Sequence, residues 1–128
     1  MPSPLALRLA PLQGAPVERV GLVLKDGTIV ELPNISGAPE ECFLVDPRDM
    51  LNHEDEMVAT WHTHPRTPAT LSADDYQTYQ MWPELLHIVV GTDGVKGYVV
   101  VNGAVVNDAS QNHPAWNLEE TTSDRLHM

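Results

Sequence analysis

The sequence predicts a single domain of mixed α/β (α+β) class, with helices packed on a strongly curved, mixed β-sheet. Three observations lead to this class. The chain has 128 residues, which is enough for one hydrophobic core and too few for two. Short apolar and β-branched segments recur along it and are bounded by glycine, proline or asparagine, as strands are. One stretch between them, residues 72–81, carries the signals of a helix.

The clearest local element is an early β-hairpin. Residues 17–24 and 28–32 are rich in valine, leucine and isoleucine, and the segment between them contains the Asp-Gly pair Asp26-Gly27, which is typical of hairpin turns. Residues 5–12, which precede the hairpin, are ambiguous between a short helix and a strand. The sheet is therefore expected to begin with an antiparallel pair.

The remaining elements follow from the same signals. Asn102-Gly103 favours a type I′ turn. Pro83 should end the helix that precedes this proline. In chain order we expect a strand at residues 42–45, a helical turn or two at 47–52, a strand at 57–62, the helix at 72–81, and strands at 86–90, 97–101 and 104–106. From residue 111 the sequence is polar without a clear period, which predicts a mobile or partner-dependent tail. We therefore divide the chain into a domain at 1–108 and a polar C-terminal tail at 109–128.

The charge balance limits the classes of partner. Asp and Glu total 18 against 7 Lys and Arg, which gives a formal net charge of -11. Phosphate backbones and anionic membrane surfaces would be repelled, so neither nucleic acid nor a membrane is expected as a direct ligand. The sequence lacks a long apolar run and a signal-peptide pattern, which predicts a cytoplasmic protein. The lone Cys42 has apolar neighbours that predict a buried thiol.

The most informative segment is the run His-Thr-His-Pro at residues 62–65, which a Ser-x-x-Asp pattern follows. Side chains alternate along an extended chain, so His62 and His64 point to the same side and can face one metal ion. Zinc accepts histidine nitrogen and carboxylate oxygen, and a catalytic site typically has three protein ligands and one open position. His62, His64 and Asp75 would be those ligands, with one Zn²⁺ per chain. Two prolines after His64 predict a loop that folds back over the site.

Parts of this pattern have simpler explanations. Ser72, three residues before Asp75, also fits a helix-start signature related to the capping box, which requires no metal. Asp74 could replace Asp75 as the carboxylate, although that choice breaks the Ser-x-x-Asp spacing. His87 precedes an apolar segment and is better explained as a hydrogen-bonded histidine at the edge of the core than as a fourth ligand.

At these residues the sequence resembles the JAMM metalloenzyme family, also named JAB/MPN/Mov34, whose signature is His-x-His-Pro followed by Ser-x-x-Asp. The resemblance implies that His62, His64 and Asp75 bind zinc and that Ser72 helps to hold the oxyanion formed during hydrolysis. It extends over roughly residues 16–107 and implies the curved mixed sheet of that family. Within the family, the chain is most similar to small bacterial and phage members, including the Mov34-like domain of phage tail-assembly proteins.

The family also has an upstream glutamate, usually the first residue of a Glu-x-x-Gly-Leu pattern on an early strand. Residues 18–22 read Glu-Arg-Val-Gly-Leu, so the resemblance makes Glu18 the candidate general acid/base. On its own, Glu18 could also be an outward-facing charge on an edge strand. Glu31, Glu40 and Glu41 are competing carboxylates, but none of them begins this pattern.

These residue types suit hydrolysis of an amide or isopeptide bond. Zinc lowers the pKa of a bound water to about 7 and polarises a carbonyl oxygen. Glu18, within hydrogen-bond reach, would accept the proton and return it to the departing amine, while the Ser72 hydroxyl would donate to the oxyanion. Two imidazoles and a carboxylate also suit iron, so the identity of the metal stays open.

Three functions are considered. The first is a zinc-dependent metallopeptidase or isopeptidase that acts on the C-terminal tail of a ubiquitin-like or sulfur-carrier protein, or on a related peptide. The second is a phage tail-assembly protein that acts mainly through protein contacts, which would place the chain in the virion. The third is a noncatalytic scaffold of the same fold, which the complete ligand set disfavours. Each partner is a protein or peptide, and the sequence leaves the oligomeric state open.

Overall fold

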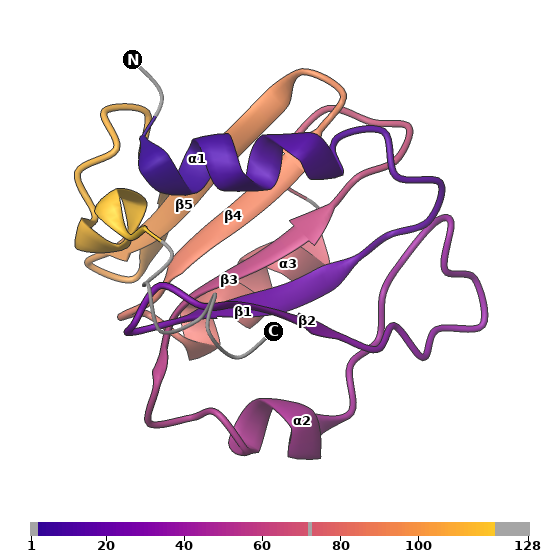
Figure 1. The fold of residues 1–128 in the computed structure, drawn as a ribbon, viewed down its shortest axis with the longest axis horizontal. Coiled ribbons are helices and arrows are strands. Elements are labelled where there is room, and N and C mark those ends of the chain that lie inside the picture. Colours follow the sequence, from indigo (N-terminus) through magenta and orange to yellow (C-terminus); the bar gives the residue numbers. More distant parts are fainter. Residues whose placement is uncertain (1–2, 72, 120–128) are drawn as a thin grey trace.

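Six strands form one mixed sheet in the computed structural model, which describes residues 3–71 and 73–119 (Figure 1). In chain order the elements are α1 (Pro4–Leu9), the 3₁₀ turn η1 (Ala10–Leu12), β1 (Val20–Leu24), β2 (Ile29–Leu32), α2 (Pro47–Leu51), β3 (Met57–Thr63), α3 (Ala73–Met81), β4 (Leu86–Gly91), β5 (Gly94–Val101), β6 (Ala104–Asn107) and the 3₁₀ turn η2 (Pro114–Asn117). This architecture confirms the predicted mixed α/β domain. Among the helices of these residues, none is long and apolar enough to cross a membrane.

The order of the strands places the end of β3 next to the start of α3. The strands lie in the order β2-β1-β3-β4-β5-β6, and every neighbouring pair is antiparallel except β3 and β4. A parallel pair needs a crossover connection, and here that connection contains α3. The register pairs His62 of β3 with Val20 of β1 on one side and with Val89 of β4 on the other. His62 therefore lies in the middle of the sheet, near the end of a central strand.

Two hairpin turns lie where the sequence predicts them. Between β1 and β2, Gly27 has a φ of 89°, a conformation that favours glycine. Between β5 and β6, Asn102 and Gly103 have φ values of 51° and 82°, as a type I′ turn requires. The ambiguous residues 5–12 are helical, because Ser3 supplies a side-chain N-cap for α1.

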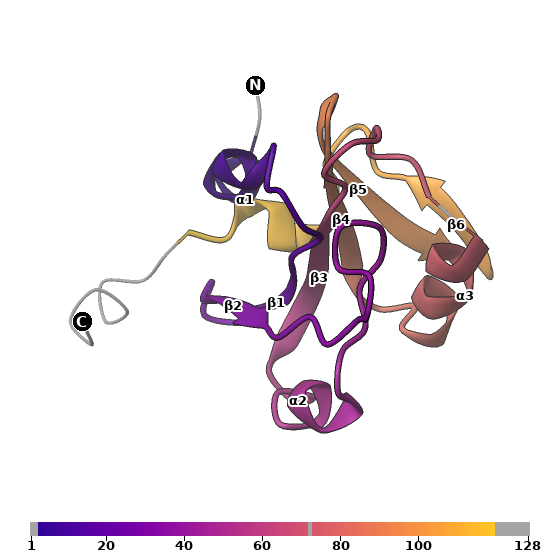
Figure 2. The ribbon, with the colours of Figure 1, turned by 90° about the vertical axis from the view of Figure 1, so that its right-hand side faces the viewer.

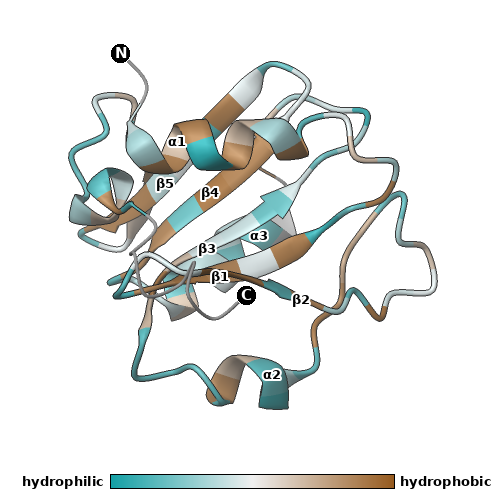
Figure 3. Cartoon of the chain, in the orientation of Figure 1, coloured by the Kyte–Doolittle hydropathy of each residue, from teal (hydrophilic) through white to brown (hydrophobic). Residues whose placement is uncertain are grey.

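Helices cover both faces of the sheet. Figure 2 shows the sheet from the side, with α1 on one face and α3 on the other. The face under α1 contains an apolar cluster that includes Leu5, Trp61 and Trp116, and the face under α3 contains smaller clusters around Leu22 and Tyr79. Strand β4 is buried along its whole length and is brown over most of it in Figure 3, because both of its faces are covered.

Residues 42–45, expected to be a strand, are not part of the sheet in the described residues. The Ile35 N–H donates to the Leu44 carbonyl at 2.8 Å, and two further backbone groups of this segment bind the side chain of Asn34. Its Nδ2 donates to the Cys42 carbonyl at 3.2 Å, and its Oδ1 accepts from the Leu44 N–H at 3.0 Å. One amide can satisfy two backbone groups but cannot continue a ladder. The expected burial of the Cys42 thiol is also wrong, because this residue is exposed and its Sγ lies 3.0 Å from the Ser36 hydroxyl.

The chain does not become a free tail at residue 111. Trp116, in η2, is fully buried, and its indole N–H donates to Asp108 Oδ2 at 2.9 Å. Gly97 of β5 permits this packing, since a Cβ there would lie 2.1 Å from the Trp116 ring. The expectation of a mobile tail from residue 111 is therefore wrong for the residues up to the end of η2. The domain boundary at residue 108 stays a prediction, and residues 120–128 lie outside the described part of the chain.

Candidate metal centre

The two histidines of the His-x-His pattern meet at the end of β3. His62 belongs to the strand and His64 lies just beyond it. Their Nε2 atoms are 3.1 Å apart. His62 is 3% exposed, and this burial lowers its pKa, so the imidazole is neutral near pH 7. A neutral imidazole is the form of histidine that binds a metal ion.

The loop after His64 fixes the tautomer of that histidine. His64 Nδ1 lies 2.8 Å from the carbonyl oxygen of Pro68. A carbonyl oxygen only accepts hydrogen bonds, so Nδ1 carries the hydrogen and Nε2 presents its lone pair to the site. The loop is itself anchored, because the Ala69 N–H donates to Asp93 Oδ1 at 2.7 Å and the Tyr98 hydroxyl donates to the Ala69 carbonyl at 2.5 Å. The predicted loop therefore forms and holds His64 against the site.

Helix α3 adds a carboxylate from its first turn. Asp75 is 8% exposed, its Oδ1 lies 3.7 Å from His62 Nε2, and its Oδ2 lies 4.0 Å from His64 Nε2. Ser72 lies outside the described residues, and only the backbone of Asp74 is described, as part of α3. The role of Ser72 and the alternative ligand at Asp74 therefore stay predictions.

Glu18 enters the site from the segment before β1. Its N–H donates to the Pro39 carbonyl at 2.6 Å, and Asn34 Nδ2 donates to its carbonyl at 2.8 Å. The residue is 7% exposed, and burial, with a smaller contribution from the negative charge of Asp75, raises its pKa to about 7. The ligand atoms of Glu18 and the two histidines all lie within 4.8 Å of one another. Glu18 is thus buried at the site rather than an outward-facing strand charge.

The two histidine nitrogens have the spacing that a small divalent cation needs. Zinc bonds of about 2.0–2.1 Å in a tetrahedron separate two ligand atoms by about 3.3 Å. The two Nε2 atoms lie 3.1 Å apart, whereas Asp75 approaches them with different oxygens, Oδ1 at 3.7 Å from His62 and Oδ2 at 4.0 Å from His64. The Asp75 side chain would therefore have to move before one of its oxygens joined both histidines on one ion, while one ligand atom each of Glu18, His62 and His64 already lies within 4.8 Å of the others.

A hollow of about 280 Å³ lies next to the two carboxylates of this group. Glu18 and Asp75 form part of its wall, and the extended segment from Glu41 to Val45 and Thr78 form the rest. The two buried carboxylates are thus reached from solvent through an open space. The two histidines are not among the described residues that line it.

Comparison with known proteins gives the family of this fold and site. Residues 5–114 match the family model of prokaryotic homologs of the JAB domain. The chain belongs to this family. It is 31% identical over 105 residues to a Thermus thermophilus protein named a probable TtuB-protein conjugate cleaving protease, and the match covers 74% of this chain and 70% of that protein. A Desulfitobacterium hafniense protein of known solution structure has a similar fold, with a TM-score of 0.59 and 24% identity over 80% of this chain and 82% of that one.

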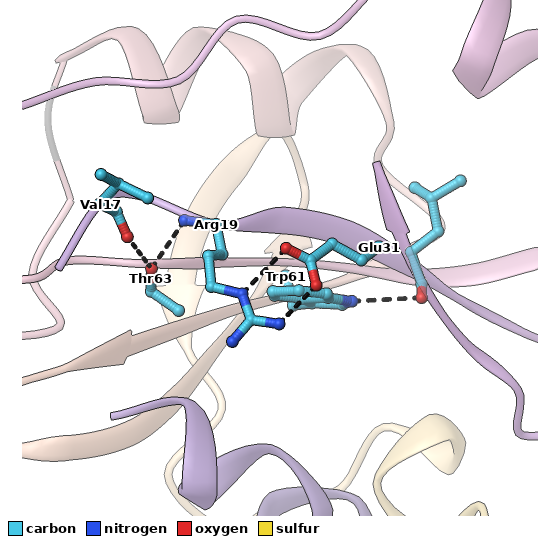
Figure 4. Close-up of polar contacts among 6 residues, drawn as sticks. Val17, Arg19, Glu31, Trp61 and Thr63 are labelled. Atoms are coloured by element: carbon cyan, nitrogen blue, oxygen red, sulfur yellow. Dashed lines mark hydrogen bonds and ion pairs between the residues drawn. The ribbon is translucent and has the colours of Figure 1, made fainter. Parts of the chain in front are cut away.

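The competing glutamates of this JAB domain lie outside the group of ligand atoms. Glu31 of β2 accepts from Arg19 Nε at 2.9 Å and forms an ion pair with the guanidinium, as Figure 4 shows. Arg19 follows Glu18 in the chain, so its side chain lies on the opposite face of the sheet. Glu40 is exposed, and Glu41 lines the hollow without joining the histidines. The geometry favours Glu18 among these carboxylates.

His87 of the JAB domain is a core histidine, as expected, and not a fourth ligand. It is fully buried, and its Nε2 donates to the Trp82 carbonyl at 3.0 Å. Its Nδ1 therefore accepts from the Thr60 hydroxyl at 2.8 Å. Burial lowers its pKa to about 4, so the ring is neutral and both nitrogens are occupied within the protein.

Sequence reasoning missed two residues that hold the Glu18 segment, Asn34 and Thr63. Asn34 binds the Glu18 carbonyl, as described above. The Thr63 hydroxyl accepts from the Arg19 N–H at 2.8 Å and donates to the Val17 carbonyl at 3.4 Å (Figure 4). Thr63 occupies the unspecified position of the His-x-His-Pro pattern, so the pattern itself gives no signal for its role.

Proposed function

We propose that this JAB domain is a zinc-dependent isopeptidase. It would cleave the bond that joins the C-terminal tail of a ubiquitin-like or sulfur-carrier protein to an amino group of another protein. The observation that carries the proposal is the buried carboxyl of Glu18, whose pKa is raised to about 7 next to two histidines and Asp75. The name of the Thermus thermophilus relative, a probable conjugate cleaving protease, supports the same class of reaction.

His62, His64 and Asp75 would hold one zinc ion per chain. When bound, zinc supplies a water ligand with a pKa of about 7 and polarises a carbonyl oxygen. The Pro68 carbonyl already directs the His64 lone pair into the site, so this ligand needs little reorganisation. The open hollow next to Glu18 and Asp75 would admit an extended peptide tail to the carboxylate side of the site.

Glu18 would move the proton during hydrolysis. A base whose pKa lies near the working pH can accept a proton from the attacking water and return it to the departing amine. Burial favours the neutral, proton-carrying form of Glu18, which the second of these steps requires. Ser72 would donate to the oxygen that becomes negative, a contribution of up to about 3–4 kcal/mol.

Bound metal is the first quantity to measure. Wild type and His64→Ala, purified without added metal, would be compared by elemental analysis. We expect one zinc per chain in wild type and much less in His64→Ala, because the variant loses one of three ligands. His53→Ala, which alters a histidine outside the site, should keep the wild-type content. Wild-type protein without metal would contradict the proposal.

The role of Glu18 is tested separately from the role of the ligands. Glu18→Ala should retain zinc and lose hydrolysis of a purified conjugate by about 10²–10⁴-fold, the usual contribution of a general acid/base. Glu40→Ala, which removes an exposed carboxylate, should behave like wild type. Loss of zinc from Glu18→Ala would make Glu18 a ligand and overturn its assignment as the base.

The alternative functions remain predictions from the sequence. A role in phage tail assembly and a noncatalytic scaffold would both act through protein contacts. None of the observed contacts favours either of them over hydrolysis.

A further inference from the structure

Thr63 lies between the two histidines of the site but faces the other way. Side chains alternate along β3, so the Thr63 hydroxyl lies on the opposite face from His62. Thr63 is 1% exposed. Its Oγ1 accepts from the Arg19 N–H at 2.8 Å and donates to the Val17 carbonyl at 3.4 Å (Figure 4). One hydroxyl therefore bridges the two residues on either side of Glu18.

The backbone on either side of Glu18 is bonded to Thr63, although it lies before the sheet begins. Strand β1 starts at Val20, so residues 17–19 are not held by strand pairing. The Thr63 N–H also donates to the Arg19 carbonyl at 2.9 Å. Thr63 thus binds the Val17 carbonyl and both the N–H and the carbonyl of Arg19. The N–H and the carbonyl of Glu18 itself bind Pro39 and Asn34.

We propose that Thr63 is a positioning residue, which fixes the Glu18 carboxyl relative to His62 and His64. This inference rests on the proposed function of the site. Strand β3 would present the two histidines from one face and bind the Glu18 segment from the other, so that the ligands and the base move together. The β-branched side chain of threonine has few χ1 rotamers, which keeps its hydroxyl in place. A displacement of a catalytic group by about 1 Å costs up to about 100-fold in rate.

The test compares Thr63→Val, which has a similar shape but no hydroxyl, with Thr63→Ser, which retains the hydroxyl. In Thr63→Val we expect kcat for conjugate hydrolysis to fall about 10- to 100-fold. Zinc affinity and KM should stay within about twofold of wild type, because His62, His64 and Asp75 are intact. Thr63→Ser should recover most of kcat. Thr60→Val is the matched control, since it removes a hydroxyl of the same strand that binds His87 instead.

Hydrogen exchange gives a readout that does not depend on activity. In the metal-free protein, the Arg19 amide should exchange about fivefold faster or more in Thr63→Val, as expected for the loss of one hydrogen bond. Thr63→Ser and Thr60→Val should keep the wild-type exchange rate at this amide. A purely structural role would lower overall stability in Thr63→Val and Thr60→Val alike and leave kcat at the wild-type level.

Three results would overturn the inference: unchanged kcat in Thr63→Val, a parallel loss of zinc affinity and kcat, or an equal loss of kcat in Thr60→Val. A parallel loss would mean that Thr63 acts through the histidines. If wild type with bound zinc hydrolyses no conjugate, the proposed function fails. The exchange rate at Arg19 then still decides whether Thr63 holds the Glu18 segment.

Discussion

At the scale of single residues, Glu18 makes the stability of the metal-free protein depend on pH. Its pKa is about 7 in the folded chain, against an ordinary value of 4.5. Between these pH values the folded chain binds more protons than the unfolded chain, so the free energy of unfolding falls as the pH rises. Glu18→Gln removes this ionisation. We expect the variant to be more stable than wild type at pH 8 by at most about 3 kcal/mol, and by less than about 1 kcal/mol at pH 5.

Urea unfolding of metal-free protein between pH 5 and pH 8 would measure this difference. Glu40→Gln is the control, because it replaces an exposed carboxylate, and its unfolding should follow the wild-type pH dependence. A gain in Glu18→Gln that is the same at every pH would show that ionisation of a buried carboxyl is not its cause.

Two buried tyrosines near the site differ in whether the hydroxyl makes a hydrogen bond within the described residues. Tyr98 donates to the Ala69 carbonyl, whereas the Tyr79 hydroxyl has no partner among the described residues. A buried polar group left unpaired costs about 1–3 kcal/mol, and a hydrogen bond that is made contributes about 1 kcal/mol. Tyr79→Phe should therefore raise the free energy of unfolding by roughly 1 kcal/mol, and Tyr98→Phe should lower it by roughly as much. Chemical denaturation of both variants would check the signs, and effects of the same sign would contradict this explanation.

The side chains of the site were predictable to different degrees. The two histidines have a local signal, the alternation of side chains along a strand. Asp75 also has one, because it lies at the start of the next helix. Glu18 required the family resemblance, since the residues it meets lie far along the chain. Thr63 and Asn34 gave no signal, because threonine in a strand and asparagine in a loop are common. Their bonds to residues 17–19 exist only after distant segments pair.

At the scale of elements, local composition predicts too much regular structure in one segment and too little in another. Residues 42–45 have the apolar composition of a strand, but their backbone is bonded to the Asn34 side chain and to one backbone N–H, that of Ile35, and no ladder forms. The turn η2 lacks a periodic apolar pattern, and a single large side chain orders it. Trp116 is buried against α1 and over Gly97, contacts that no local pattern encodes.

The importance of η2 predicts how truncation affects the fold. A chain that ends at Asp108 should be less stable than one that ends at Glu119 by about 3–5 kcal/mol or more, the usual cost of removing a buried tryptophan side chain. Thermal or urea unfolding of the two chains would measure the difference. Equal stability would show that residues 109–119 are dispensable, as a domain boundary at residue 108 supposes.

At the scale of the whole molecule, the class of fold was predictable but the order of strands was not. β1 and β2, and likewise β4, β5 and β6, are joined by short turns, and such strands usually pair with each other. The pairings of β3 with β1 and β4 join segments separated by long connections, which local patterns do not specify. The site depends on these two pairings, because they bring the Glu18 segment and α3 to the end of β3.

The net charge of -11 predicts a preference among substrates. Glu41 lines the hollow next to Glu18 and Asp75, so a basic peptide segment would be attracted both by the whole molecule and by the entrance to the site. A conjugate with lysine or arginine next to the scissile bond should therefore be cleaved with a kcat/KM about tenfold higher than a conjugate with glutamate there, at low ionic strength.

Salt dependence separates this long-range attraction from a specific contact. The Debye length falls from about 30 Å at 0.01 M to about 3 Å at 1 M ionic strength, so the ratio of the two kcat/KM values should approach one as salt is added. Hydrolysis of both conjugates would be followed across this range. A ratio that does not change with salt would instead indicate direct recognition of a side chain, and a preference for the acidic conjugate would contradict electrostatic attraction altogether.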